Sequence, residues 1–175
     1  MDRGTGRHTD YEAWRRGALG ERIVGKELER LGNRWRVLHS VPDGNRGGDI
    51  DHLLIGPGGV FCINTKNHSR VPVKVTAGSI YTSGHRTDYL VKARAQAERA
   101  TARLGVTVFP MLCIIPHEEG KYSEQGTPAD VAVVRSDRLQ KWAKALIPRL
   151  SEAQVEAIYA KARRLSTWTT PTRKA

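Results

Sequence analysis

The chain has 175 residues, of which 39% are hydrophobic, and this is enough apolar material for one sizeable core. Lysine and arginine outnumber aspartate and glutamate by 29 to 18, and the resulting net charge of +11 favours a polyanionic partner. The first residues are polar, and no segment approaches the about 20 apolar residues that span a bilayer, so we expect no secretory signal, no membrane partner and a cytoplasmic protein.

The first predicted element is a helix over residues 14–31, preceded by a flexible segment over 1–13. At 100° per residue one stripe of this helix is apolar or small except for Glu21 in its middle. A carboxylate in that position either pairs with a cation such as Lys66 or points into a site. Gly17 and Gly25, to either side, would allow the helix backbone to approach a sheet closely.

The next elements are a strand over 35–41, a glycine-rich connection over 42–48 and a hairpin over 50–66 that turns at Gly-Pro-Gly-Gly. Pairing Ile55 with Val60 places Asp51 opposite Asn64. Lys66 then lies diagonal to Asp51 at about 7–8 Å on the same face, while alternation sends His52 to the other face.

A carboxylate, an amide oxygen and an ammonium on one face of a hydrophobic hairpin suit metal-assisted phosphodiester hydrolysis. Hard oxygen groups hold Mg²⁺ or Mn²⁺, and the ammonium serves the attacking water. The alternative is an ordinary ion pair between Asp51 and Lys66 at a solvated sheet edge, worth about 0–1 kcal/mol.

In the second half of the chain, the sequence mainly predicts helices and strands that support the hairpin. An extended pair over 71–81 precedes a helix over 88–104 that ends at Gly105, with Gln96 beside its core stripe of Ala93, Ala97, Ala100 and Leu104. Buried strands follow at 111–115 and 131–134, separated by a polar loop, and then helices over 136–146 and 151–165 and a basic flexible tail over 166–175. Cys62 and Cys113 lie in apolar runs and predict buried free thiols rather than a disulfide.

The runs Gly17-Ala-Leu-Gly-Glu21, Gly48-Asp-Ile-Asp51-His-Leu-Leu-Ile-Gly-Pro-Gly-Gly-Val-Phe61 and Ile63-Asn-Thr-Lys-Asn67 resemble the nuclease-related domain (NERD) family. This family is regarded as a branch of the PD-(D/E)xK, restriction-endonuclease-like superfamily. The resemblance is most specific over 14–104. It implies one α/β domain over 14–165 with a central mixed β-sheet flanked by helices, and Mg²⁺-dependent cleavage of nucleic acid.

Carried over position by position, the resemblance makes Asp51 the acidic metal ligand, Asn64 the second acidic position and Lys66 the lysine of the motif. Glu21 agrees with the family's Gly-Glu motif as an additional metal or water ligand. Thr65 joins the candidate ligand set, and Gln96 is a further candidate, because related nucleases carry a polar helical residue after the lysine strand.

Asn64 departs from the family pattern, which expects glutamate, and an amide is a neutral and weaker ligand for Mg²⁺. One explanation is an active variant whose missing charge comes from Glu21. The other is a degenerate site in a nucleic-acid-binding or recruitment module on the same fold.

The expected activity is that of a metal-dependent deoxyribonuclease, with an RNA-acting enzyme as a weaker alternative and a homodimer or a partner protein as further associations. The cations expected to contact the nucleic-acid backbone are Arg46, Lys92, Arg94, Arg99 and Arg103.

Overall fold

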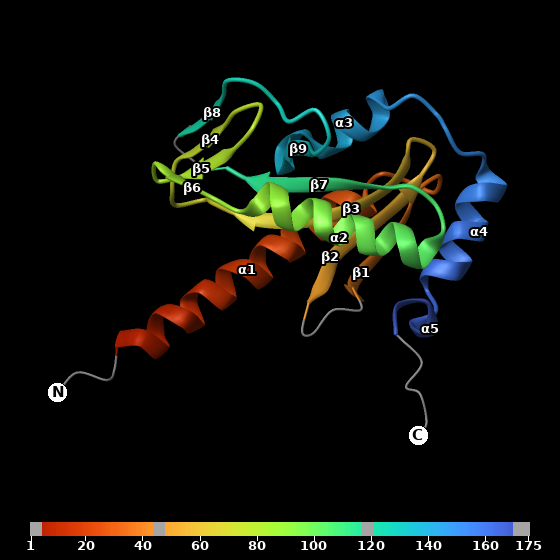
Figure 1. Ribbon diagram of the computed structural model, residues 1–175, viewed down its shortest axis with the longest axis horizontal. Coiled ribbons are helices and arrows are strands. Elements are labelled where there is room, and N and C mark those ends of the chain that lie inside the picture. The colour runs from red at the N-terminus through yellow and green to blue at the C-terminus, as the bar shows by residue number, and fades with distance from the viewer. Residues whose placement is uncertain (1–4, 44–47, 117–120, 170–175) are drawn as a thin grey trace.

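A five-stranded sheet forms the centre of the computed structural model, which describes residues 5–43, 48–116 and 121–169, with side chains from residue 11 onward (Figure 1). The strand order is β1-β2-β3-β7-β9. These strands are β1 (Arg36–Pro42), β2 (Asp49–Gly56), β3 (Gly59–Asn67), β7 (Val108–Ile115) and β9 (Ala132–Arg135). Neighbours from β1 to β3 are antiparallel, whereas β3, β7 and β9 are parallel.

Helices cover both faces of this sheet. They are α1 (Thr5–Glu29), α2 (Tyr89–Leu104), the 3-10 turn η1 (Ser136–Arg138), α3 (Leu139–Ala145), α4 (Glu152–Ala162) and α5 (Leu165–Trp168). The molecule is therefore mixed α/β with a central mixed sheet flanked by helices, as the sequence predicts.

The β2–β3 hairpin has the register expected from its turn. Ile55 pairs with Val60 and Gly56 with Gly59, whose φ of 132° suits glycine. A Cβ on Gly56 would lie 2.1 Å from the Trp35 ring, and one on Gly58 would lie 2.6 Å from Leu146. The turn therefore needs glycine for close packing as well as for backbone conformation.

Each face of the sheet has its own core. On one face Val24 and Leu28 of α1 pack with Leu54, Ile63 and Met111. On the other face the predicted stripe of α2 packs with α4 against Ile50, Leu53, Ile55 and Cys62. Both predicted thiols, Cys62 and Cys113, are buried and free.

A second, four-stranded sheet lies beyond the end of β3, in the order β6-β5-β4-β8. Its strands are β4 (Val73–Val75), β5 (Ile80–Thr82), β6 (His85–Arg86) and β8 (Tyr122–Glu124). The strand β8 forms within the segment expected as a polar loop, because Val73 to Val75 offer a parallel partner. This sheet packs on α2 and β7 through a third apolar cluster, which contains Val73, Val75, Ile80 and Leu90.

Within the described residues, both segments expected to be flexible contain helix. Helix α1 begins at Thr5, well before the start of its apolar stripe at Trp14. Part of the expected basic tail forms α5, because Trp168 is only 2% exposed and its indole N–H donates a 2.6 Å hydrogen bond to Ala162 O. None of the described helices is long and apolar enough to cross a membrane.

Candidate active site

Asp51 lies where β2 and β3 separate. In the described residues the ladder ends at the His52–Ile63 pair, so the predicted pairing of Asp51 with Asn64 does not form. Instead, the backbone N–H of Thr65 donates a 2.6 Å hydrogen bond to Asp51 Oδ2. The Asp51 carboxylate is thus hydrogen-bonded to the main chain of β3, the strand that carries Asn64 and Lys66.

The other neighbour of Asp51 is an irregular point in β1. Ser40 has a φ of 49°, and the β1–β2 pairing skips from His39–His52 to Val41–Ile50. Side-chain alternation breaks here, because Ile50 and Leu53 belong to the same core cluster. Asp51 and His52 consequently line one cavity instead of opposite faces, which corrects the prediction from strict alternation.

This first cavity, of about 430 Å³, lies between α1 and the strands β1 and β2. Glu21 lines it together with Asp51, so the helix carboxylate does face the hairpin carboxylate. Glu21 is half-buried, and no ion pair joins it to Lys66 in the described part of the chain. The charge of Glu21 still acts on Lys66 at longer range, so the two groups are electrostatic neighbours without a direct ion pair.

The environment of Asp51 favours its protonated form. Burial raises the pKa of Asp51 to about 6, the hydrogen bond from Thr65 opposes this shift, and the negative charge of Glu21 adds to it. A bound cation would remove this penalty by compensating both carboxylates. Asp51 is therefore a titratable group whose ionisation depends on what lies beside it in the cavity.

Lys66 follows Thr65 on β3, and its side chain reaches the start of α2. Its Nζ lies 4.9 Å from the ring centre of Tyr89, the first residue of α2. Burial lowers the pKa of Lys66, and the charge of Asp51 opposes the shift. A second cavity, of about 480 Å³, is lined by Lys66 and Tyr89 together with Arg16, His68 and Arg70.

Two buried oxygens on β3 have no hydrogen-bond partner among the described residues, and they are Asn64 Oδ1 and Thr65 Oγ1. Unpaired buried oxygens are costly unless something completes them. No group of three His, Cys, Asp or Glu side chains suited to a metal occurs in the described residues. The donor set is therefore two carboxylates with amide and hydroxyl oxygens, a hard-oxygen set that fits Mg²⁺ or Mn²⁺ but with low charge.

His52 pairs with His39 through a 2.7 Å contact between their Nδ1 atoms. One ring must donate and the other accept, so at least one is neutral. Burial lowers the pKa of His52 to about 4, and the neighbouring His39 adds to this. His52 is therefore a neutral packing and hydrogen-bonding residue in the wall of the first cavity.

Gln96 is buried, whereas a solvated helix flank was the more natural expectation from its place beside the core stripe. Its Nε2 donates a 2.9 Å hydrogen bond to Asp49 O, and the Cys62 thiol donates to its Oε1 at 3.5 Å. Gln96 thus ties α2 to the start of β2, two residues before Asp51. Gln96 therefore holds the backbone of β2 next to Asp51 and does not itself line the cavity that contains Asp51.

The cations predicted on α2 already have carboxylate partners. Lys92 Nζ lies 2.8 Å from Asp88, Arg94 Nε lies 2.6 Å from Asp130, and Arg99 lies 2.6 Å from the buried Asp43. Arg46 lies outside the described residues. These pairs reduce the charge that α2 offers to a polyanion.

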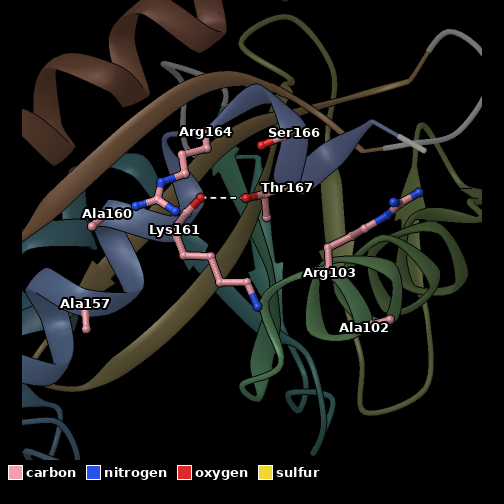
Figure 2. A pocket seen from close by; sticks show the side chains of 8 residues that line it. All are labelled: Ala102, Arg103, Ala157, Ala160, Lys161, Arg164, Ser166 and Thr167. Atoms are coloured by element: carbon pink, nitrogen blue, oxygen red, sulfur yellow. Dashed lines mark hydrogen bonds between the residues drawn. The ribbon is translucent and has the colours of Figure 1, made fainter. Parts of the chain in front are cut away.

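Arg103 lines a cleft with Lys161 and Arg164 at the far end of α2 (Figure 2). Figure 2 shows the three charged ends pointing in different directions instead of toward one point. The Lys161 ammonium donates a 2.8 Å hydrogen bond to Leu104 O. The cleft is therefore a diffuse basic surface rather than a preformed phosphate site.

Sequence reasoning missed the cations nearest the site. Arg15, Arg16, Arg22 and Arg70 line a third cavity beside the second one. The sequence does contain a sign of their position, because Arg16 and Arg22 flank the Gly-Glu motif and Arg70 follows Lys66 by four residues.

The central mixed sheet with helices on both faces, and the hairpin that carries Asp51 and Lys66 at its diverging end, define a restriction-endonuclease-like protein. The nuclease-related domain matches residues 16–115, more than half of the chain, and the protein belongs to this family, whose known context is the PD-(D/E)xK superfamily. Comparison with curated proteins and with solved structures gave no match.

Proposed function

We propose that this protein is a metal-dependent nuclease that hydrolyses phosphodiester bonds of DNA at the site formed by Glu21, Asp51, Asn64 and Lys66. The observation that carries the proposal is the state of Asp51. It is a largely buried carboxylate with a pKa raised to about 6, placed near a second carboxylate and next to a strand with two unpaired oxygens. A cation bound there would compensate the charge of both carboxylates.

Asp51 and Glu21 would supply the charge that holds the metal, and Asn64 and Thr65 would supply neutral oxygens. When bound, Mg²⁺ or Mn²⁺ would polarise the scissile phosphate and lower the pKa of a coordinated water. The Thr65 N–H fixes the orientation of Asp51 without a flexible intermediary.

Lys66 would orient the attacking water and offset the negative charge that develops on the phosphate. Its lowered pKa, caused first by burial, raises the fraction of neutral amine that could accept a proton from the attacking water. Tyr89 holds the ammonium in place by the cation–π contact at 4.9 Å. The water oxygen would then bond to phosphorus as the bond from phosphorus to the leaving oxygen breaks. The water proton would pass to a neutral Lys66 amine, and the leaving oxygen would take a proton from solvent.

A second candidate function follows from Asn64. With an amide in place of the second carboxylate, the site carries less charge than the family pattern, and a nucleic-acid-binding or recruitment module without catalysis is the alternative. The excess of basic residues supports binding in both cases.

The test incubates the purified protein with plasmid, linear duplex, single-stranded DNA and RNA in Mg²⁺, Mn²⁺ or EDTA. We expect DNA cleavage in metal, none in EDTA, and none with Asp51→Ala, while Asp51→Ala keeps most of its DNA affinity, because backbone cations supply that affinity. A Glu98→Ala control, at an exposed carboxylate on α2, should cleave as the wild type does. Metal-independent cleavage, or full cleavage by Asp51→Ala, would contradict the proposal; binding without cleavage would favour the alternative.

A further inference from the structure

The N-terminal half of α1 extends away from the body of the molecule (Figure 1). It carries the exposed side chains of Tyr11 and Trp14, which are 59% and 68% exposed, and the 52% exposed Leu19 follows them on α1. The rings of Tyr11 and Trp14 lie nearly parallel, with centroids 6.3 Å apart and planes inclined by 24°. Exposed aromatic pairs of this kind mark interaction surfaces rather than elements of a core.

Arginines lie beside the aromatic pair and along the helix that carries it. The guanidinium of Arg15 lies 5.8 Å from the Tyr11 ring centre, and Arg15, Arg16, Arg22 and Arg70 line the third cavity. The carboxylate of Glu12 also lines this cavity, at 3.9 Å from Arg16 in an exposed and therefore weak pair. The surface is strongly basic.

This surface is continuous with the candidate active site. Arg16 and Arg70 line both the third cavity and the second one, which contains Thr65 and Lys66. Along α1 the rise from Trp14 to Glu21 is about 10 Å, a separation that a few nucleotides can cover. A strand held at the site would therefore pass directly over the arginines toward the aromatic pair.

We propose that the arm formed by residues 11–22 of α1, together with Arg70, binds a single-stranded segment of the nucleic-acid substrate, with bases stacked on Trp14 and Tyr11 and phosphates held by the arginines. This rests on the proposed function, which makes nucleic acid the ligand. Flat aromatic faces with neighbouring guanidinium groups suit unpaired bases, whose faces are free, whereas bases inside a duplex are covered by their neighbours. A second copy of the chain is disfavoured as occupant, because two such surfaces would bring like charges together.

The test measures the affinity of the protein for labelled oligothymidylate and for a duplex of equal length by fluorescence anisotropy. EDTA is present, so that binding is measured without cleavage of the probe. We expect the wild type to bind the single strand more tightly than the duplex, and Trp14→Ala to weaken single-strand binding about ten-fold with little effect on the duplex. Trp14→Phe should retain most of the affinity, because it keeps an aromatic face. Val91→Ala, at a 66% exposed apolar position on α2, is the matched control and should bind as the wild type does.

Equal single-strand binding by Trp14→Ala and wild type would overturn the inference. So would self-association of the wild type that Trp14→Ala abolishes, since the surface would then belong to a second copy. The outcome is separable from that of the proposed function. Selective binding without cleavage in Mg²⁺ refutes the nuclease alone, whereas cleavage with unaltered binding by Trp14→Ala refutes the arm alone.

Discussion

Asp51 Oδ2 lies 2.6 Å from the backbone nitrogen of Thr65, and this contact joins the candidate metal ligand of β2 to the residue that precedes Lys66. The position of the Asp51 carboxylate relative to Lys66 is thus fixed by a hydrogen bond from the main chain, and main-chain positions vary less than side-chain rotamers. If a phosphate binds between Asp51 and Lys66, this hydrogen bond keeps the two side chains at a constant separation.

Lys66→Met is expected to reduce DNA cleavage by about 100-fold or more, because the substitution removes the charge that stabilises the transition state. The free energy of unfolding should be unchanged or higher, since a buried ammonium is costly. Single-turnover cleavage and urea titration measure the two effects. Lys74→Met, on the exposed side of β4, is the control, and equal loss in both variants would contradict the role of Lys66.

Asn64→Glu is expected to tighten Mg²⁺ binding and to raise cleavage at low Mg²⁺, because it adds a second anionic ligand on β3. Rates measured across a Mg²⁺ titration test this, with Ser123→Glu as a control that adds the same charge at an exposed strand position. A lower rate at all Mg²⁺ concentrations would show instead that Glu21 already supplies the missing charge and that a further carboxylate is repelled. Glu21→Gln in the same titration should then be the more damaging change.

The stability of the metal-free protein should carry a signature of Asp51. Its pKa is 3.8 as a free side chain and about 6 in the fold, so the folded state holds more protons between these values and the Asp51 contribution to unfolding free energy falls as pH rises through them. The decrease is at most about 3 kcal/mol. Above the folded pKa the contribution is constant.

His52 gives the opposite slope, because its pKa is lowered to about 4 and the unfolded state gains protons first as pH falls from 6.5. The difference between wild type and Asp51→Asn isolates the carboxylate. In denaturant titrations with EDTA, we expect the stability of Asp51→Asn relative to wild type to increase as pH rises from 4 to 6. In a second series with Mg²⁺ in place of EDTA, this increase should be smaller. A pH-independent difference would show that Asp51 ionises normally.

Two glycines of α1 provide a matched pair. A Cβ on Gly20 would lie 2.9 Å from Asn67 Cβ, whereas a Cβ on Gly17 would meet nothing within 4 Å. Gly20→Ala should push α1 away from β3, displace the adjacent Glu21 and reduce both stability and cleavage. Gly17→Ala should raise stability by about 0.5–1 kcal/mol through helix propensity alone. Thermal unfolding and cleavage rates of both variants decide this, and similar behaviour of the two would contradict the packing argument.

The glycine pair also shows where sequence reasoning succeeds and fails. The apolar stripe of α1 is visible in the sequence. The expected close approach to the sheet occurs at Gly25, where a Cβ would lie 3.4 Å from the His39 ring, but not at Gly17. The tightest approach is at Gly20, because it depends on how far the helix overlaps β3. The hairpin register from Gly56–Gly59 to His52–Ile63, the Gly105 cap of α2 and the helix that follows Ser151 are confirmed, since all are local in the chain.

The remaining site geometry depends on distant partners. The irregular backbone at Ser40 decides where Asp51 and His52 point, and nothing in the local pattern signals it. Burial of Gln96 follows from contacts with Asp49 and Cys62 in the hairpin. The pairing of Arg94 with Asp130 joins residues far apart in the chain, so a count of cations overestimated the charge of α2.

The parallel pairing of β3 with β7 has a consequence for the order of folding. The antiparallel hairpin of β2 and β3 closes through a short turn, but residues 60–67 find their second neighbour only in residues 108–115. Closing such a long loop is slow compared with hairpin formation. During synthesis the strand with Asn64 and Lys66 therefore stays an open sheet edge until β7 has left the ribosome, and a nascent chain cannot present a finished site before that point.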